Sequence, residues 1–165
     1  MKPIGYVRTS FSDEEVKSSL RGVEGYVEIL EEYAGGLRGL EGFSHVILIA
    51  YMHKVSGEQR KTLLVKPRRL LRFGFKLKEL PEVGVFATDS PHRPNPIALT
   101  IVELVEIRGN KLYVRELDLY DGTPVLDIKP YTPDRMVDPS KLSVPEWYAK
   151  LAREVRTRLG FDAPI

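Results

Sequence analysis

The sequence predicts a mainly β domain followed by one amphipathic helix. Three observations lead to this fold class. Runs of β-branched and apolar residues are bounded by glycine and proline, a Gly109-Asn110 dipeptide separates two such runs, and a helical pattern is confined to residues 143–160. At 165 residues with 42% hydrophobic content, the chain is long enough for one core, and one domain is the default expectation.

The first half of the chain contains two segments in which apolar and polar residues alternate and one segment that is fully apolar. Alternation predicts strands at residues 3–9 and 26–30, and the apolar run at 43–52 predicts a strand that is buried on both faces or nearly so. The glycine-rich residues 35–42 favour a short helical turn and loops, and residues 84–88 lead into a proline-rich loop.

The second half contains the hairpin. Residues 97–117 predict two strands joined at Gly109-Asn110, a dipeptide suited to a tight hairpin turn. A change in the phase of alternation at Ile101-Val102 predicts a β-bulge there. Residues 123–131 predict a further short strand.

The C-terminal segment is helical in pattern. Ser143 and Glu146 match a capping box, Pro145 is tolerated in the first turn, and Gly160 is placed to end the helix. We expect residues 1–142 to form the β domain and residues 143–165 to pack on it or on a second subunit. The apolar stripe that favours core or interface contacts consists of Trp147, Leu151 and Val155, with Tyr148, Ala152 and Leu159 beside it.

Composition excludes several kinds of site. The chain has no cysteine, so it has no disulfide, thiolate metal site or cysteine nucleophile, and with three histidines we expect no zinc site. Neither an apolar leader nor an apolar run long enough to cross a bilayer is present, which predicts a cytoplasmic protein with no membrane partner.

Charge is distributed unevenly, although the net charge is only +2. Residues 60–78 contain eight basic residues and no acidic residue, and Phe73 and Phe75 in this run could stack on bases. The alternative is a solvated basic face, or a set of partners for nearby carboxylates. For tRNA phosphates the candidates are Arg68, Arg69, Arg72 and, outside the run, Arg93.

The segment "ATDSPHRPNPIALT", residues 87–100, contains three prolines within six positions. Each proline fixes its own φ and restricts the preceding residue, so the loop is rigid before anything binds. Such a loop presents its polar side chains from a fixed frame, or it is simply a rigid connector between strands. We do not expect Ser90 and His92, which lie two residues apart in the loop, to form a nucleophile and base pair.

A second polar segment, "YDGTPVLDIKPY", begins at Tyr120. Gly122 lets the backbone approach a ligand closely, and the carboxylates of Asp121 and Asp127 can accept hydrogen bonds from ribose hydroxyls or an ammonium group. A turn-capping role for the aspartates is equally consistent with the sequence. Glycine-rich phosphate loops and the G-x-S-x-G motif are absent, which excludes Rossmann and α/β-hydrolase folds.

Three segments, "LEGFSHVILIAYMHK", "GVFATDSPHRPNPIAL" and "LDLYDGTPVLDIKPY", together resemble the TsaA/TrmO-like family. These are S-adenosylmethionine-dependent tRNA methyltransferases that modify N6 of threonylcarbamoyladenosine-37. The resemblance covers residues 4–131 and implies a single antiparallel β-barrel, a homodimer, S-adenosylmethionine as cofactor and tRNA as partner. Where bacterial members have a Pro-Arg-Gln stretch, this chain has "SDEEVKSSLRG".

The resemblance also implies the cofactor site. Asp89 stands where the family usually has arginine, and Ala98 replaces the usual glycine, so any contact made by that arginine is rerouted or lost. The implied cofactor-binding residues are His53, Lys54, Asp89, Leu99, Tyr120, Asp121, Gly122 and Thr123.

The activity we expect is methyl transfer to an exocyclic nitrogen of a tRNA adenosine. Alignment of the methyl group with the nitrogen supplies most of the catalysis, and Asp121, Asp127 and His92 are the candidates for accepting the proton that the nitrogen loses. The alternative function is a non-catalytic module that binds S-adenosylmethionine or a nucleotide.

Overall fold

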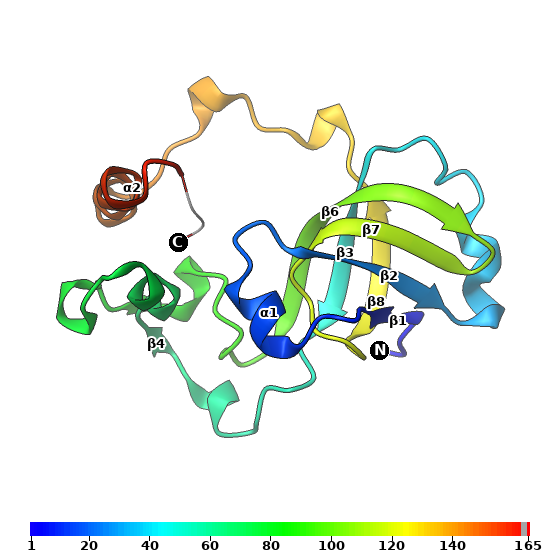
Figure 1. Cartoon of the computed structure of the whole chain (residues 1–165), viewed down its shortest axis with the longest axis horizontal. Coiled ribbons are helices and arrows are strands. Elements are labelled where there is room, and N and C mark those ends of the chain that lie inside the picture. Colours follow the sequence, from blue (N-terminus) through cyan, green and yellow to red (C-terminus); the bar gives the residue numbers. More distant parts are fainter. Residues whose placement is uncertain (163–164) are drawn as a thin grey trace. The chain divides into compact units, whose positions relative to one another are not determined.

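Six antiparallel strands close into a barrel in the computed structural model, which describes residues 1–162 and 165 (Figure 1). The strand order around the barrel is β1-β2-β7-β6-β3-β8, and β8 pairs with β1 to close it. Closure removes the unpaired edges that an open sheet would expose. The predicted mainly β fold and the barrel implied by the family resemblance are confirmed. The six strands are β1 Gly5–Arg8, β2 Val23–Ile29, β3 His45–Tyr51, β6 Ile97–Arg108, β7 Lys111–Leu117 and β8 Pro124–Pro130.

The remaining elements are short except for the C-terminal helix. β4 Leu64–Val65 and β5 Val83–Gly84 form a separate two-stranded sheet. The α-helices are α1 Asp13–Ser18 and α2 Glu146–Leu159. The 3-10 helices are η1 Glu31–Leu37, η2 Gln59–Lys61, η3 Arg68–Phe73, η4 Leu77–Glu79, η5 Val85–Ala87, η6 Pro133–Arg135 and η7 Pro139–Lys141.

Two compact units make up the chain, and each combines two stretches of sequence. The first unit, Met1–Lys54 with Pro96–Arg135, contains the barrel. The second unit, Val55–Asn95 with Met136–Ile165, contains the small sheet, the proline-rich loop as far as Asn95, and α2. How the C-terminal segment relates to the barrel, or to a second copy of the chain, stays a prediction.

The barrel interior is filled by alternate residues of its strands. Along β6, Thr100 and Val102 are buried, whereas Leu99 and Ile101 are exposed. Full burial of an aliphatic side chain contributes about 1.5–3 kcal/mol, so this interior is the main source of the first unit's stability. Its most completely buried members are Val7, Val27, Val46, Leu48, Leu112, Leu117 and Val125.

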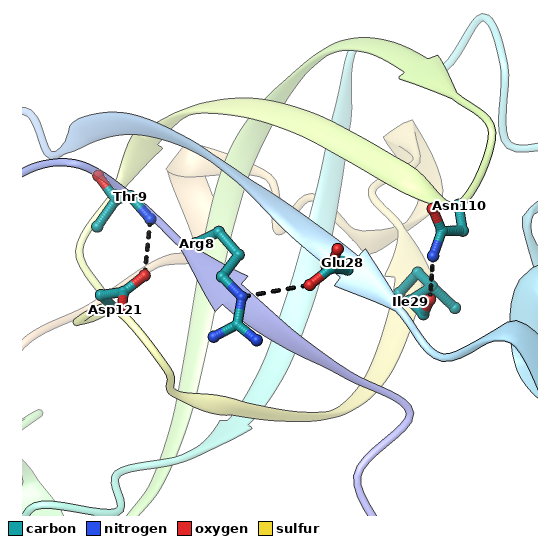
Figure 2. Close-up of polar contacts among 6 residues, drawn as sticks. All are labelled: Arg8, Thr9, Glu28, Ile29, Asn110 and Asp121. Carbon is teal, nitrogen blue, oxygen red and sulfur yellow. Dashed lines mark hydrogen bonds and ion pairs between the residues drawn. The ribbon is translucent and has the colours of Figure 1, made fainter.

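The hairpin between β6 and β7 turns at Gly109 and Asn110, as predicted. The side-chain amide of Asn110 also donates a hydrogen bond to the carbonyl of Ile29 at 2.7 Å, which attaches the turn to β2 (Figure 2). The bulge predicted at Ile101-Val102 was wrong, because both residues pair regularly with β3. The register shift lies between Leu104 and Glu106. The phase change arose because outward-facing residues of β6 are apolar too.

The second unit has its own small core. Leu151 and Val155 on α2 pack with Leu70, Phe75 and Leu80, all of which are buried. Two residues of the predicted stripe, Leu151 and Val155, are therefore core residues.

The predicted capping box of α2 was wrong, whereas Gly160 ends the helix in the left-handed conformation, as predicted. Pro145 occupies the N-cap position with extended dihedral angles and no side-chain hydrogen bond, so Ser143 lies two residues too early to cap. A capping box does occur at α1, where Ser12 and Glu15 bond reciprocally.

Candidate functional site

One end of the barrel brings together two of the segments that the sequence singled out. β3 ends where β6 begins, because Tyr51 pairs with Ile97. The first residues of β8 lie at the same end, since they pair with β1 and with Ala50 on β3. Residues 53–54, which follow β3, and the turn at 120–123, which precedes β8, therefore leave the barrel at a common end.

The turn at 120–123 is attached to β1 and to the residue after it. The amide of Gly122 donates to the carbonyl of Val7 at 2.8 Å, and the φ of Gly122 is +75°, a conformation that glycine adopts without strain. A carboxylate oxygen of Asp121 accepts a hydrogen bond from the amide of Thr9 at 3.0 Å (Figure 2). This bond fixes the direction of an exposed carboxylate, so the turn-capping and ligand-binding roles of Asp121 are compatible.

Thr123 supports this turn from inside the barrel. Its side chain is buried, and its carbonyl accepts a hydrogen bond from the amide of Val7 at 2.9 Å. Its amide donates to the carbonyl of Tyr120 at 3.1 Å. A direct contact between Thr123 and a cofactor stays a prediction.

Lys54 is a cation at this end of the barrel. Its ammonium lies 2.7 and 2.5 Å from the two carboxylate oxygens of Asp13, in the first turn of α1, and 5.1 Å from the ring centroid of Tyr120. The side chains of both ion-pair partners are about half exposed, so the pair itself adds only about 0–1 kcal/mol to stability. Asp13 was missed from the sequence, where it was only one of several acids in an acidic stretch.

His53 is held in its neutral form. Partial burial lowers the pKa of its imidazole below the usual 6.5, and the nearby charge of Lys54 lowers it further. The carboxylates of Asp13 and Asp121 act in the opposite direction but do not reverse the shift. At neutral pH the imidazole therefore offers one donor and one acceptor nitrogen and no charge.

Leu99 and Asp127 share a row on the outer face of the barrel. Both pair with Ile49, Leu99 from β6 and Asp127 from β8, so the three side chains point to the same side of the sheet. Leu99 is 68% exposed, which leaves its surface available for an apolar ligand or partner. Asp127 accepts a hydrogen bond from the amide of Ile128 and forms an ion pair with Lys129 at 2.7 Å.

Asp89, His92 and Arg93 lie in the proline-rich loop of the second unit. The side chains of Asp89 and His92 are exposed, whereas Arg93 is half-buried and donates to backbone carbonyls of its own loop. The loop is therefore internally bonded as well as stiffened by proline.

The basic run forms η3 and the segment after it. Arg68 and Arg72 are exposed and Arg69 is half-buried. The suggestion that Phe75 stacks on bases was wrong, because its side chain is 3% exposed and the guanidinium of Arg158 lies 3.8 Å from its ring centroid.

The two units differ in charge. The second unit contains 14 lysine and arginine residues against 8 acidic residues, a net charge of +6. The first unit contains 11 against 15, a net charge of −4. The uneven distribution seen along the sequence is thus also a division between the units, which favours the second unit for contacts with phosphate.

Within the described part of the chain, no helix is both long and apolar enough to cross a membrane. The same residues contain no cluster of three or more histidine or acidic side chains able to hold a metal ion.

Comparison with known proteins links this fold to tRNA modification. A probable S-adenosyl-L-methionine-binding protein of Pyrococcus abyssi is 42% identical over 137 residues, covering 81% of this chain and 68% of that protein. A mouse tRNA (adenine(37)-N6)-methyltransferase is 42% identical over 120 residues, which cover 73% of this chain but 26% of the mouse protein. A crystal structure of TrmO superimposes with a TM-score of 0.65 and 29% identity, over 97% of this chain and 75% of that one.

The family model named tRNA-methyltransferase O N-terminal domain matches residues 11–136. This range includes the turn at 120–123, the proline-rich loop and most of the strands. Because the match extends over more than half of the sequence, the chain belongs to the tRNA-methyltransferase O N-terminal domain family.

Proposed function

We propose that this protein is an S-adenosylmethionine-dependent methyltransferase acting on N6 of adenosine at position 37 of tRNA, with threonylcarbamoyladenosine as the substrate nucleoside. The family match supports the reaction class, and the methyltransferase name of the mouse relative supports the position on tRNA. The threonylcarbamoyl group rests on the resemblance alone.

The observation that carries the cofactor proposal is the charge arrangement around Lys54. S-adenosylmethionine has a carboxylate, an ammonium group, ribose hydroxyls and an adenine ring. Lys54 complements the carboxylate, and the exposed carboxylates of Asp13 and Asp121 complement the ammonium group and the hydroxyls. The exposed aliphatic side chain of Leu99 suits adenine. The residue types therefore fit this cofactor.

When bound, S-adenosylmethionine supplies a methyl group that its sulfonium already activates. On transfer, the bond between the methyl carbon and the sulfonium sulfur would break and leave a neutral thioether, while the new C–N bond forms at N6 and N6 gives its proton to an acceptor on the protein. Of the three candidate acceptors, Asp121 lies in the turn at the Lys54 end of the barrel, Asp127 is paired with Lys129, and His92 lies in the second unit. Between the two carboxylates of the barrel, this arrangement favours Asp121 as the proton acceptor.

We further propose that the second unit, with its net charge of +6, binds the tRNA backbone through Arg68, Arg69 and Arg72. A tRNA substrate is consistent with a cytoplasmic protein. The outer face of β6 supports a homodimer, because Ile97, Leu99 and Ile101 are apolar and 39–68% exposed in a row.

The test is a methylation assay with two tRNA preparations that differ only in the threonylcarbamoyl group at position 37. Nucleoside mass spectrometry should show one added methyl group on the threonylcarbamoylated adenosine and none on the unmodified one. Methylation of both preparations would keep the enzyme class but remove the threonylcarbamoyl requirement.

A second candidate function is a non-catalytic S-adenosylmethionine-binding module. The name of the Pyrococcus relative favours it, since it mentions binding without a reaction. Cofactor binding with no methylation of any tRNA would select this function.

A further inference from the structure

Arg93 makes an unusual set of contacts for a surface arginine. Its Nε donates to the carbonyl of Ser90 at 2.8 Å, and one terminal nitrogen donates to the carbonyl of Val85 at 3.0 Å and also to that of Thr88. Two of its three nitrogens thus donate to backbone carbonyls three to eight residues earlier in the chain. The side chain is half-buried as a result.

The loop needs an additional hydrogen-bond donor because its prolines lack a backbone N–H group. Pro91, Pro94 and Pro96 have no amide hydrogen, so this stretch cannot satisfy its carbonyls by a regular backbone ladder. The planar guanidinium carries five donors in a fixed fork and can reach several carbonyls at once. Hydrogen bonds from a charged donor are also stronger than neutral ones.

Two hydroxyl groups complete the same framework. Thr88 Oγ1 donates to the carbonyl of Val85 at 3.0 Å and accepts from the amide of Ser90 at 3.2 Å. Ser90 Oγ accepts from the amide of His92 at 3.3 Å. Thr88, Ser90 and Arg93 are therefore directed inward and half-buried.

The other polar side chains of the loop are directed outward. Asp89, His92 and Asn95 are all exposed and alternate with the inward set. The loop thus divides its polar residues into an internal framework and an outward group available to a ligand.

We infer that Arg93 is a positioning residue that holds the proline-rich loop in the conformation presenting Asp89, His92 and Asn95, and that it is not a phosphate ligand. This inference revises the tRNA-binding role expected for Arg93 from the sequence. The expected effect of Arg93 substitutions on kcat rests on the proposed methyltransferase function, whereas the hydrogen bonds that Arg93 makes within the loop do not.

Substitution by lysine distinguishes a loop-positioning role of Arg93 from a phosphate-binding role. An ammonium group keeps the charge that a phosphate contact needs, but it lacks the planar fork that spans the three carbonyls. Arg93→Lys and Arg93→Ala should therefore behave alike, each lowering kcat by roughly tenfold to a hundredfold, the scale for a displaced positioning group. The salt dependence of tRNA affinity should be the same in both variants as in the wild type.

The matched control is Arg68, an exposed arginine of the basic run. Arg68→Gln should flatten the log–log salt slope by roughly 0.7–0.9 and Arg68→Lys should not, as expected for one phosphate contact. If Arg93→Lys retains wild-type kcat while Arg93→Ala flattens the slope, Arg93 is a phosphate ligand and the inference is wrong.

A measurement on the wild type tests the framework without any variant and without activity. In NMR spectra, the Nε–H of Arg93 should exchange slowly with solvent and show a coupling across the hydrogen bond to the carbonyl carbon of Ser90. Fast exchange without that coupling would overturn the inference even if the enzyme is active. A slow, coupled Nε–H in a protein that methylates nothing would uphold it while the proposed function fails.

Discussion

The ammonium of Lys54 lies 2.7 and 2.5 Å from the two carboxylate oxygens of Asp13, 41 residues earlier in the chain. α1 therefore places a carboxylate on Lys54, the first lysine or arginine after β3. Because both side chains are about half exposed, a ligand can reach the pair, and the pair contributes little to stability. Lys54 is thus better suited to binding than to folding.

Lys54→Gln should weaken S-adenosylmethionine binding by about 1–3 kcal/mol, the range for losing a hydrogen bond to a charged group, and should leave the melting temperature almost unchanged. Calorimetry with the cofactor alone measures the affinity. Lys61→Gln is the matched control, because Lys61 also forms an exposed ion pair, with Glu58, but lies in the second unit. Equal affinities in wild type and Lys54→Gln would remove Lys54 from the site.

Two substitutions of Asp121 separate its structural and binding roles. Asp121→Asn keeps an oxygen that can accept from the amide of Thr9, whereas Asp121→Ala leaves that amide without its acceptor. Both variants should bind the cofactor about 1–3 kcal/mol more weakly, and only the alanine variant should also lose about 0.5–1.5 kcal/mol of stability. Calorimetry and chemical denaturation measure the two effects. An asparagine variant that binds as tightly as the wild type would show that the carboxylate charge is not used.

His53 should make the stability of the first unit depend on pH. Its pKa in the folded protein lies below the unfolded value of 6.5, so its contribution to stability is present above pH 6.5 and is lost as the pH falls through the folded pKa. His53→Gln should remove this part of the pH dependence. Thermal melts of both proteins across the acidic range provide the measurement, and parallel curves would mean that the imidazole titrates as it does in the unfolded chain.

The barrel strands could be predicted because each is indicated by a pattern of residues that are neighbours in the sequence. Alternation along β2 and β6 and the Gly109-Asn110 turn each depend on neighbouring residues, which a single sequence shows directly. The stripe of α2 was predictable for the same reason, since Leu151 and Val155 lie one helical turn apart.

The site could be predicted only in part, because its contacts join distant residues. No local pattern in the sequence indicates the pairing of Asp13 with Lys54. The same holds for the contact between the Arg158 guanidinium and the ring of Phe75, which lies 83 residues earlier in the sequence. Local residues could show that the proline-rich loop is rigid, but they could not show that Arg93 turns back onto its own carbonyls.

The exposed apolar row of β6, consisting of Ile97, Leu99 and Ile101, predicts a homodimer. Ile101→Asp should convert a dimer to a monomer at micromolar concentration, because a buried unpaired carboxylate at an interface costs several kcal/mol. The resulting monomer should still unfold cooperatively, since Ile101 is 39% exposed within one chain. Leu77→Asp, at a 44% exposed residue of the second unit, is the control. Sedimentation that shows a monomeric wild type would contradict the dimer itself.

The triple variant Arg68→Gln, Arg69→Gln, Arg72→Gln tests whether the second unit binds tRNA. If each side chain contacts one phosphate, the log–log salt slope of tRNA affinity should flatten by about two to three in total, with S-adenosylmethionine binding intact. The control variant replaces Arg38, Arg108 and Lys111, basic residues of the net-negative first unit, and should keep the wild-type slope. If the three arginines instead serve carboxylates within the chain, the triple variant should melt at a lower temperature and bind tRNA with an unchanged slope. Filter binding at several salt concentrations, with a melting curve for each variant, distinguishes these results because the phosphate role changes the slope and the structural role changes the melting temperature.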